Sequence, residues 1–487
     1  SMSVPLHDVI QVRSHSFFCL VRSLLHFDFD FTVLAKPGLR SFIAFVEFSL
    51  GTILIMAEGD KPEGSQPFDM QKAINKLVIG ERELPRSAPR TEREAQERDY
   101  KFWKTQPVPG LNDTSEADVN EPVEADKDVA EIRQQPLVLP AQFAWSNIDA
   151  SDEAQLNDLY ELLRDNYVED DDMTFRFDYS REFLKWVLLP PGYKLDWLVG
   201  VRVKSNNKLV GFISGIPVHI RIYSKTLSLA EVNFLCVHKK LRSKRLAPVL
   251  IKEVTRRINL TGIFQAVYTA GVVLPKPISK CRYFHRPIQH KKLLECGFTV
   301  LAPNVTMQRF MKLYKLPEEA PVKGIRKAEE KDLEQIHTLL EDYLKRFSLV
   351  PVFVSLDEIR HYLLPREGVI STYVIEDLET KKITDFFSFY HLPSSIVRSN
   401  SQGHKRLYAA YSYYNVCTTH SLQDVLQSAL IIAKEDGIDV FNALDIMENS
   451  TVLRYLKFGA GDGYLRFYLY NWRCSDMPSN QVGLVLQ

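Results

Sequence analysis

A basic turn between a strand-like and a helix-like pattern is the first place where this sequence could bind an anion. Arg242, Ser243, Lys244 and Arg245 follow the apolar run 232–237 and precede an apolar-periodic segment that ends near Ile258. A helix that begins after such a turn presents free backbone N–H groups and the positive end of its dipole, which favour phosphate, and the basic side chains add charge. The string alone fits a solvated basic patch or a nuclear-localisation-like run equally well.

The end of the chain is a second candidate for chemistry. The last six residues, Val482-Gly-Leu-Val-Leu-Gln487, are apolar up to the final position, which predicts that this end docks inside the protein. A free α-carboxyl has a pKa near ~3.5 and is a poor base. Burial among apolar residues raises that pKa toward the range that is useful for proton transfer. The alternative is a tail that packs only for stability.

An acidic run beside aromatic residues could line a groove for a basic peptide. Residues 169–172 read Glu-Asp-Asp-Asp, and Phe175, Phe177 and Tyr179 follow at every second position. Carboxylates attract lysine or arginine, and aromatic side chains supply contact area. The alternative is an ordinary solvated loop.

The cysteines favour neither a metal site nor a disulfide framework. Six are present, at positions 19, 236, 281, 296, 417 and 474, without a CxxC pair or an accompanying histidine cluster. We therefore predict no metal and reduced thiols, as in a cytosolic protein. Cys236 lies in a strand-like run, and although His238 follows closely, the sequence supplies no obvious base that would activate Cys236 as a nucleophile.

Length and charge set the remaining limits. With 487 residues, the chain is too long for one compact core, so two or more domains are expected. Lys plus Arg equals Asp plus Glu at 61 each, which gives no reason to expect nucleic-acid or membrane binding from bulk charge. Two apolar stretches within residues 1–55 carry too many charges for a transmembrane helix. We expect Met56 to be the natural start, with a weakly membrane-leaning leader as the alternative.

An internal repeat predicts how the candidate residues are positioned. The helical pattern around Leu162 recurs around Leu339, the strand-like run that starts at Lys208 recurs at Lys382, and that at Val232 recurs at Ser412. The offsets are 339 − 162 = 177, 382 − 208 = 174 and 412 − 232 = 180, and such nearly constant spacing indicates duplication of one α/β unit. Only the first copy carries the basic turn. Chance recurrence of similar elements is the alternative.

The turn resembles the pyrophosphate loop of the GCN5-related N-acetyltransferase (GNAT) superfamily, usually written Gln/Arg-x-x-Gly-x-Gly/Ala. This sequence departs from the pattern because Arg245 stands at the first glycine position, while Ala247 fits the second. Longer strings closely resemble the N-myristoyltransferase family: Glu231-Val-Asn-Phe-Leu-Cys-Val-His-Lys-Lys-Leu-Arg-Ser-Lys-Arg-Leu-Ala-Pro-Val-Leu, Lys457-Phe-Gly-Ala-Gly-Asp-Gly-Tyr-Leu, Tyr100-Lys-Phe-Trp-Lys-Thr-Gln-Pro-Val-Pro, Phe264-Gln-Ala-Val-Tyr-Thr-Ala-Gly and Cys281-Arg-Tyr-Phe-His-Arg. The resemblance runs from about Tyr100 to Gln487.

The resemblance implies an α/β fold of two fused GNAT-like halves related by a pseudo-twofold repeat. It implies transfer of myristoyl from myristoyl-CoA, as cosubstrate, to the N-terminal glycine amine of proteins. We expect a largely flexible extension over residues 1–99, a coenzyme-binding half over 100–315, and a peptide-binding half over 316–487. Another acyl chain, a lysine acceptor on the same scaffold, and a non-catalytic binding module are the alternatives.

The resemblance also assigns the residues of the coenzyme and catalytic sites. The amides of Phe234 and Leu235 would form the oxyanion hole, the Gln487 carboxylate would act as base, Thr269 would hold the substrate amine, and Asn233 would assist. A bulge in the strand could free the two amides. The residues placed around the coenzyme are Lys101, Phe102, Trp103, Phe234, Leu235, Cys236, Val237, Arg242, Ser243, Lys244, Arg245, Leu246, Ala247 and Pro248.

For the peptide, the resemblance implies a groove that attracts lysines downstream of the substrate glycine through its aspartates. The residues placed there are Tyr167, Asp170, Asp172, Phe175, Phe177, Tyr179, Tyr283, His285, Ser394, Tyr411, Asn442, Asp462 and Leu465. Substrates should begin Gly-x-x-x-Ser/Thr after removal of methionine. We expect a cytoplasmic monomer that binds no nucleic acid. Partial membrane or ribosome association stays open, although the lysine-rich ribosome-targeting region of some members is not evident.

Overall fold

The computed structural model describes residues 88–114, 118–168, 174–397 and 403–487. The expectations for the leader and for Met56 lie outside these residues, as do Asp170 and Asp172 of the predicted peptide groove. No helix in the described ranges is both long enough and apolar enough to cross a membrane. All of the described residues belong to one compact unit.

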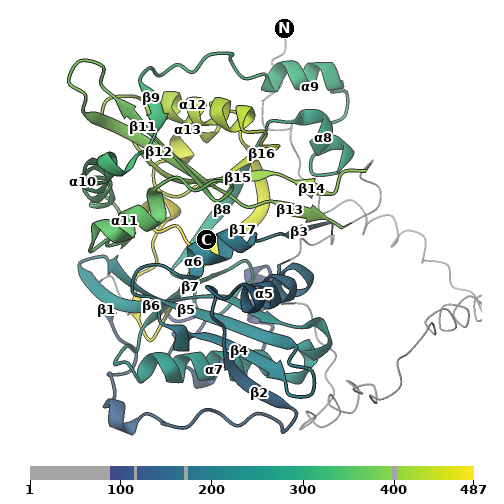
Figure 1. The fold of residues 1–487 in the computed structure, drawn as a ribbon, viewed down its shortest axis with the longest axis vertical. Helices are drawn as coiled ribbons and strands as arrows, with labels where there is room; N and C mark the ends of the chain where they lie inside the picture. Colours follow the sequence, from purple (N-terminus) through teal and green to yellow (C-terminus); the bar gives the residue numbers. More distant parts are fainter. Residues whose placement is uncertain (1–87, 115–117, 169–173, 398–402) are drawn as a thin grey trace, which may run out of the picture. The chain divides into compact units, whose positions relative to one another are not determined.

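One sheet of 13 strands carries most of the fold (Figure 1). Its strand order is β2-β4-β5-β6-β7-β17-β8-β16-β15-β12-β11-β9, and β10 pairs with β5 beside this path. The bounds are β2 (Phe143–Asn147), β4 (Leu198–Val203), β5 (Leu209–Ile222), β6 (Lys225–Val237), β7 (Ala266–Ala270), β8 (Ser279–Pro287), β9 (Ile325–Lys327), β10 (Leu349–Pro351), β11 (Ile370–Glu376), β12 (Ile383–His391), β15 (Ala409–Val416), β16 (Val440–Leu444) and β17 (Gly459–Tyr470).

Two smaller sheets flank the large one. The first pairs β1 (Asn120–Glu121) with β18 (Arg473–Cys474). The second places β13 (Ser394–Ile396) between β14 (Arg406–Leu407) and β3 (Phe175–Phe177). This second sheet joins an early segment of the chain to a late one, because Ser394 lies opposite Phe177.

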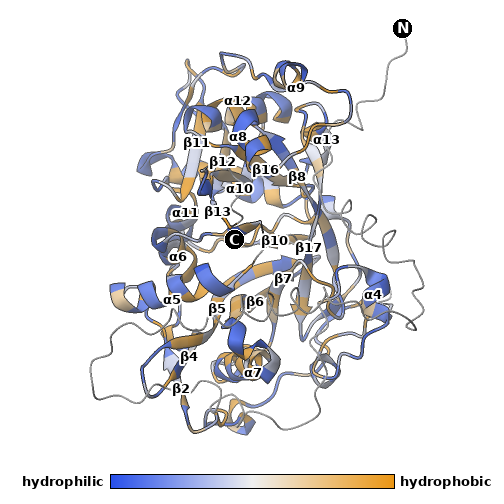
Figure 2. Cartoon of the chain, turned by 90° about the vertical axis from the view of Figure 1, so that its right-hand side faces the viewer, coloured by the Kyte–Doolittle hydropathy of each residue, from blue (hydrophilic) through white to orange (hydrophobic). Residues whose placement is uncertain are grey.

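The helices begin at polar caps and turn apolar faces inward. Asp152, Ser180, Ser355 and Ser421 each accept a hydrogen bond from a backbone N–H of the first turn of the following helix, as helix N-caps do. The helices are α4 (Glu92–Gln96), α5 (Glu153–Asn166), α6 (Arg181–Leu188), α7 (Leu246–Asn259), α8 (His290–Glu295), α9 (Met307–Tyr314), α10 (Leu333–Leu344), α11 (Leu356–Leu363), α12 (Leu422–Glu435) and α13 (Ser450–Leu453). The hydropathy colouring shows mixed polar and apolar residues along α5 and α7 (Figure 2).

The predicted repeat and fold class are confirmed. The matched segments lie in α5 and α10, in β5 and β12, and in β6 and β15. In each copy the third of these elements pairs in parallel with the next large strand, β6 with β7 and β15 with β16. In each copy the connection between those two strands contains a long helix, α7 in the first and α12 in the second. The chain therefore folds as two related α/β halves.

The halves share strands across the expected division near residue 315. Strand β17, from the late part of the chain, lies between β7 and β8 from the early part. Strand β8 in turn pairs with β16. The division itself stays a prediction, but a hydrogen-bonded sheet runs continuously across it.

The core follows the same continuity. The largest buried cluster contains Phe212 and Phe234 from the first half, Tyr414 from the second, and Leu486 at the chain end. A second cluster packs α12 and α13 against strands of the second half, around Phe389, Leu430 and Phe441. Burying side chains from both halves together favours one rigid unit around the place where their strands meet.

Candidate functional site

The chain end is held inside the fold. Val482 is fully buried, and Leu484, Val485 and Leu486 are at most 7% exposed. The Gly483 N–H donates to the Leu349 carbonyl of β10 at 2.8 Å, and the Met447 N–H donates to the Val482 carbonyl at 3.1 Å. In Figures 1 and 2 the C-terminus lies among the strands. The prediction that the apolar tail docks inside the protein is confirmed.

The terminal carboxylate meets Asn233 of β6. The Asn233 side-chain amide donates to a carboxylate oxygen of Gln487 at 2.5 Å. The other end of the Asn233 amide is also used, since its oxygen accepts the Phe234 N–H at 2.8 Å. The structure thus brings together Asn233, Phe234 and Gln487, three of the residues assigned to catalysis.

Strand β6 is bulged at the predicted place. Cys236 lies opposite Phe212 and Asn233 lies opposite Ser214, so Phe234 and Leu235 together face the single residue Ile213. Phe234 has a φ of 51°, in the left-handed region that non-glycine residues rarely adopt. Such a conformation costs about 1–2 kcal/mol, and strain of this kind is concentrated at functional sites. The bulge turns two successive amides away from the regular ladder.

Thr269 lies on the neighbouring strand at a matching position. Strands β6 and β7 pair in parallel only at Ala230–Ala266 and Glu231–Val267. Asn233 and Thr269 each follow the last pair by two residues, so they share a strand face and stand where the two strands stop pairing. This opening beyond the last pair is where an extended ligand could lie against both strands.

Aromatic side chains cover the bulge. The Tyr167 and Tyr179 rings lie 5.8 and 5.2 Å from that of Phe234. The Tyr167 hydroxyl lies 3.5 Å from the Asn233 side-chain oxygen. Burial raises the pKa of both tyrosine hydroxyls, so they stay protonated and can donate hydrogen bonds. These two residues therefore connect the predicted peptide groove to the bulge.

The basic turn has the expected strand–turn–helix form. A 3₁₀ turn, Lys239–Lys244, follows β6, and α7 begins at Leu246 without a side-chain cap on its first amides. Arg245, the departure from the glycine pattern, adopts φ 56° and ψ 30°, the conformation that glycine favours. Arg242, Ser243 and Arg245 are exposed, Lys244, Ala247 and Pro248 are half-buried, and Leu246 is buried. Most of the predicted residues can therefore reach a ligand.

The corresponding turn of the second half is filled by the protein itself. One oxygen of the fully buried Asp385 carboxylate accepts the N–H groups of Thr418, Thr419 and His420 at 2.7, 2.9 and 3.2 Å. The other accepts from the His420 ring at 2.8 Å. These hydrogen bonds hold the pKa of Asp385 below its usual range in spite of burial. Asp385 occupies the repeat position of Gly211. The second half therefore has a buried carboxylate where the first half has a glycine, which leaves the first turn without an internal anion at this position.

Lys101, Phe102 and Trp103 lie near α7 and β7. The Trp103 ring stacks on Tyr268 of β7 at 5.9 Å, and the Lys252 ammonium of α7 lies 6.0 Å from the Phe102 ring. Phe102 and Trp103 are half-buried, and Lys101 is exposed. The segment thus borders the helix whose first turn carries the predicted phosphate site.

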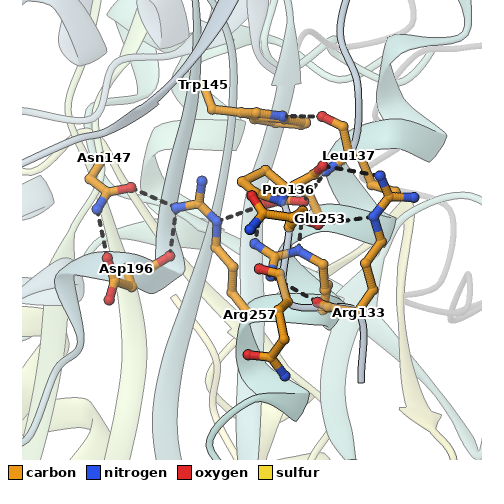
Figure 3. Close-up of polar contacts among 11 residues, drawn as sticks. Arg133, Pro136, Leu137, Trp145, Asn147, Asp196, Glu253 and Arg257 are labelled. Carbon is orange, nitrogen blue, oxygen red and sulfur yellow. Dashed lines mark hydrogen bonds and ion pairs between the residues drawn. The ribbon is translucent and has the colours of Figure 1, made fainter. Parts of the chain in front are cut away.

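A buried carboxylate fixes the far end of α7. Glu253 is fully buried and accepts from Arg256 at 2.7 Å, from Arg257 at 2.9 Å and from the Leu137 N–H at 3.0 Å (Figure 3). Arg257 also donates to the Asn147 side chain at 2.6 Å. A paired and hydrogen-bonded buried charge holds its neighbours firmly, since breaking it leaves an uncompensated ion. The network therefore ties α7 to residues 133–137 and to β2.

The predicted peptide residues that the structure describes lie close together. Tyr411 lies 6.4 Å from both Phe177 and Tyr283, ring to ring. His285 and Asn442 share a 2.7 Å hydrogen bond across β8 and β16, and burial lowers the pKa of that histidine. Ser394 pairs with Phe177, and Phe175 packs on Phe298. On β17, Asp462 lies where the pairing with β8 is interrupted, and Leu465 lies just beyond, opposite Cys281. The structure brings these side chains from both halves to one region.

The environment of Cys236 does not favour a nucleophilic thiolate. The Cys236 thiol is buried beneath the bulge, and burial raises its pKa to about 12 even though Arg242 lowers it in part. A thiol with that pKa is protonated near neutral pH and cannot attack a thioester efficiently. Within the described residues, no group of three or more His, Cys, Asp or Glu is placed to hold a metal ion.

Sequence reasoning missed two polar residues beside the chain end. Glu231 and Tyr413 line a pocket that is also lined by Gln487. Glu231 stands two residues before Asn233 on the same strand, so the two-residue period of a strand could have placed it on the same face. Tyr413 carries no such signal, because only tertiary folding brings β15 to the tail.

Comparison with known proteins adds the following. Residues 122–281 match the family described as "Myristoyl-CoA:protein N-myristoyltransferase, N-terminal domain", and residues 295–485 match its C-terminal domain. The chain is 55% identical to glycylpeptide N-tetradecanoyltransferase 2 of Bos taurus, over 81% of this chain and 78% of that one. It is 54% identical to glycylpeptide N-tetradecanoyltransferase of Drosophila melanogaster, over 80% and 81%. The structure resembles that of Saccharomyces cerevisiae N-myristoyltransferase with bound myristoyl-CoA, with a TM-score of 0.76, 41% identity, and coverage of 80% of this chain and 99% of that one.

Proposed function

The chain belongs to the myristoyl-CoA:protein N-myristoyltransferase family, and from that premise we propose that it transfers myristoyl from myristoyl-CoA to the N-terminal glycine amine of proteins. It is an acyltransferase. The observation that carries the proposal is the terminal carboxylate, which ends a buried tail and is hydrogen-bonded to Asn233 beside the bulge at Phe234. On β6, the residue that holds the base thus directly precedes the first of the two main-chain donors.

The coenzyme binds the first half in this proposal. The phosphates lie on the turn 242–248, where α7 begins without a side-chain cap and the basic side chains are accessible. Lys101, Phe102 and Trp103 contact the coenzyme along α7, and the thioester lies at 234–237 where β6 and β7 stop pairing. The second half takes no coenzyme at its equivalent turn, because the Asp385 carboxylate already uses those amides.

The reaction proceeds by direct attack. The substrate ammonium gives one proton to the Gln487 carboxylate, and its nitrogen lone pair attacks the thioester carbon. The carbonyl oxygen becomes an oxyanion, which the amides of Phe234 and Leu235 stabilise once the Phe234 N–H exchanges the Asn233 side-chain oxygen for it. As the amide forms, the carbon–sulfur bond breaks, and the second amine proton goes to the coenzyme A thiolate. After each turnover the terminal carboxyl group of Gln487 still carries one proton, which must be released before the next amine can be deprotonated.

Asn233 and Thr269 orient the reacting groups. Asn233 holds the carboxylate with its amide nitrogen and constrains the Phe234 amide with its oxygen. Thr269, at the matching position of β7, holds the amine from the other side. The carboxylate can serve as base because its tail neighbours are apolar and buried, and such surroundings raise the pKa of a carboxyl group.

The peptide lies along the aromatic groove in the proposal. Asp462, together with Asp170 and Asp172, attracts lysines downstream of the glycine. Substrates begin Gly-x-x-x-Ser/Thr, and glycine is required because a β-carbon would collide where the amine approaches the thioester. The division into 1–99, 100–315 and 316–487, the monomeric state, the cytoplasmic location, and membrane or ribosome association remain predictions from the sequence.

The test is mass spectrometry of a Gly-starting octapeptide with a lysine near its end, incubated with myristoyl-CoA. We expect one myristoyl group on the α-amine, none with an Ala-starting peptide, and little reaction with acetyl-CoA. Preference for acetyl-CoA, or modification of lysine alone, would favour the other acyltransferase reactions. Binding of both substrates without product would favour a non-catalytic module. Deleting Leu486 and Gln487 should preserve binding and abolish turnover.

A further inference from the structure

A pocket lies beside the docked tail, on the side of β6 that carries Glu231. It is lined by residues of β5, β6, β10, α11, β15 and the tail, and it contains about 560 Å³ of empty space, part of it open to solvent. Its lining includes the buried Tyr413, the half-buried Gln487 and the exposed Pro191. The pocket therefore joins the chain end to the surface.

Strand β6 contributes one titratable side chain to the pocket lining, the carboxyl group of Glu231. Glu231 precedes Asn233 by two residues, so it points to the same face as the residue that holds the terminal carboxylate. Its cross-strand neighbours are the apolar Ile216 and Val267. Within the described ranges, neither a cation nor a hydrogen-bond donor is fixed on its carboxylate. A half-buried carboxylate without such a partner is costly as an ion, and the proposed reaction steps do not use it.

The groups around Glu231 come from every element of the pocket. They are Tyr413 and Tyr414 of β15, Tyr362 and Glu358 of α11, His219 of β5, and the carboxylate of Gln487. Glu358 is already bound to the Val354 N–H at 2.8 Å. None of the described residues that line the pocket is a lysine or an arginine. Burial in this environment raises the pKa of Glu231 to about 7.

Two tyrosines line the pocket together with Glu231 and the tail. Tyr413 is hydrogen-bonded to the side-chain amide of Gln487, and Tyr414 to the backbone of Val485. Both tyrosines also feel the charge of Glu231. Because burial raises their pKa values, both hydroxyls keep their protons and remain neutral polar groups in the pocket that the two carboxyl groups share.

We propose that Glu231 accepts the proton that Gln487 takes from the substrate amine and releases it to water through this pocket. The step forms an O–H bond on Glu231, breaks the O–H bond on the terminal carboxyl, and ends with that proton on solvent. It restores the Gln487 carboxylate for the next amine. Glu231 contacts neither substrate. It acts only through Gln487, by removing the proton from the terminal carboxyl group. The proposal rests on the proposed function.

The test compares Glu231→Gln with the wild type in rate against pH, from pH 5.5 to 9, at saturating substrates. We expect the wild-type kcat to rise with pH near 7, because the acceptor must be unprotonated. The Gln variant should lose that rise and about tenfold or more in kcat at pH 7.5, with both KM values within twofold. Imidazole, a small proton carrier, should restore part of its rate and leave the wild type unchanged.

Two further variants keep the test decisive. Glu231→Asp retains a titrating carboxyl and should displace the pH rise without removing it, which tests the proposal even where the Gln variant unfolds. Glu448→Gln removes one charge of an exposed pair with Arg346 and should leave the pH profile unchanged. A Gln variant with the wild-type profile, or a lost rate that imidazole does not restore, would overturn the relay. A wild type that makes no myristoyl-peptide would instead refute the proposed function.

Discussion

Replacing Gly483 by alanine should disturb the reaction without touching any reacting group. A β-carbon at this position would lie 2.8 Å from Val350 Cγ1, 3.1 Å from Leu344 Cδ2 and 3.2 Å from Phe347 Cδ2. Carbon atoms pack best at about 3.5–4.0 Å, so the first contact is short by about 0.7–1.2 Å. Val350 and Leu344 belong to β10 and α10, whereas the tail ends four residues after Gly483, so we expect the tail to move.

The expected loss follows from that displacement. Gln487 is only four residues from Gly483, and the tail between them is packed on both sides, so a shift of about 1 Å reaches the terminal carboxylate. Misplacing a reacting group by about 1 Å can cost roughly 10²-fold in rate. We expect kcat to fall by about 10- to 100-fold, and overpacking to lower the free energy of unfolding by about 1–3 kcal/mol.

Steady-state kinetics on a Gly-starting peptide and urea denaturation measure the two effects. Val350→Ala removes the atom that meets the new β-carbon, so the double variant should recover most of the lost kcat although each change alone weakens the core. Val350→Ala alone should keep kcat within about threefold of the wild type. A Gly483→Ala protein with wild-type kcat, or a double variant that is no better than the single one, would refute the reasoning about tail position.

Three further predictions concern the turns and the thiol. Cys236→Ser should retain most activity, because the buried thiol is protonated near neutral pH; complete loss in a folded protein would revive an acyl-cysteine route. Asp385→Asn should lower the free energy of unfolding by about 2–4 kcal/mol in urea melts, since hydrogen bonds to a charge are lost from a buried site. A loss under about 1 kcal/mol would show that the amides of Thr418 and Thr419 do not need the anion. Arg245→Gly should stabilise the fold by up to about 1 kcal/mol by relieving its left-handed backbone, and a clear destabilisation in the same assay would contradict that view.

Local patterns were sufficient for much of the fold. The apolar period after the basic turn predicted α7, and the recurrence of Lys208 and Lys382 predicted two strands that do occupy equivalent places as β5 and β12. The apolar last six residues predicted a docked tail, because hydrophobic side chains at a chain end have no other favourable environment. Each of these signals lies within a short stretch of chain.

Other features depend on contacts between distant segments. The positive φ of Phe234 depends on how β6 pairs with β5 on both sides of the bulge. The amino-acid sequence of β6 alone does not determine that pairing. Asp385 reads in sequence as an ordinary strand residue, and only folding brings it to the amides of Thr418 and His420. The insertion of β17 between β7 and β8 likewise joins segments that are almost 200 residues apart. These are the parts of the site that a pattern search could not supply.

The central claim is that the terminal carboxylate of Gln487 takes the proton of the substrate amine. Its most direct test is a semisynthetic protein in which a carboxamide replaces that single carboxylate and every side chain is kept. We predict that kcat for peptide myristoylation falls at least about 100-fold while both substrates bind with nearly unchanged affinity. An amidated enzyme that turns over at the wild-type rate would contradict the account.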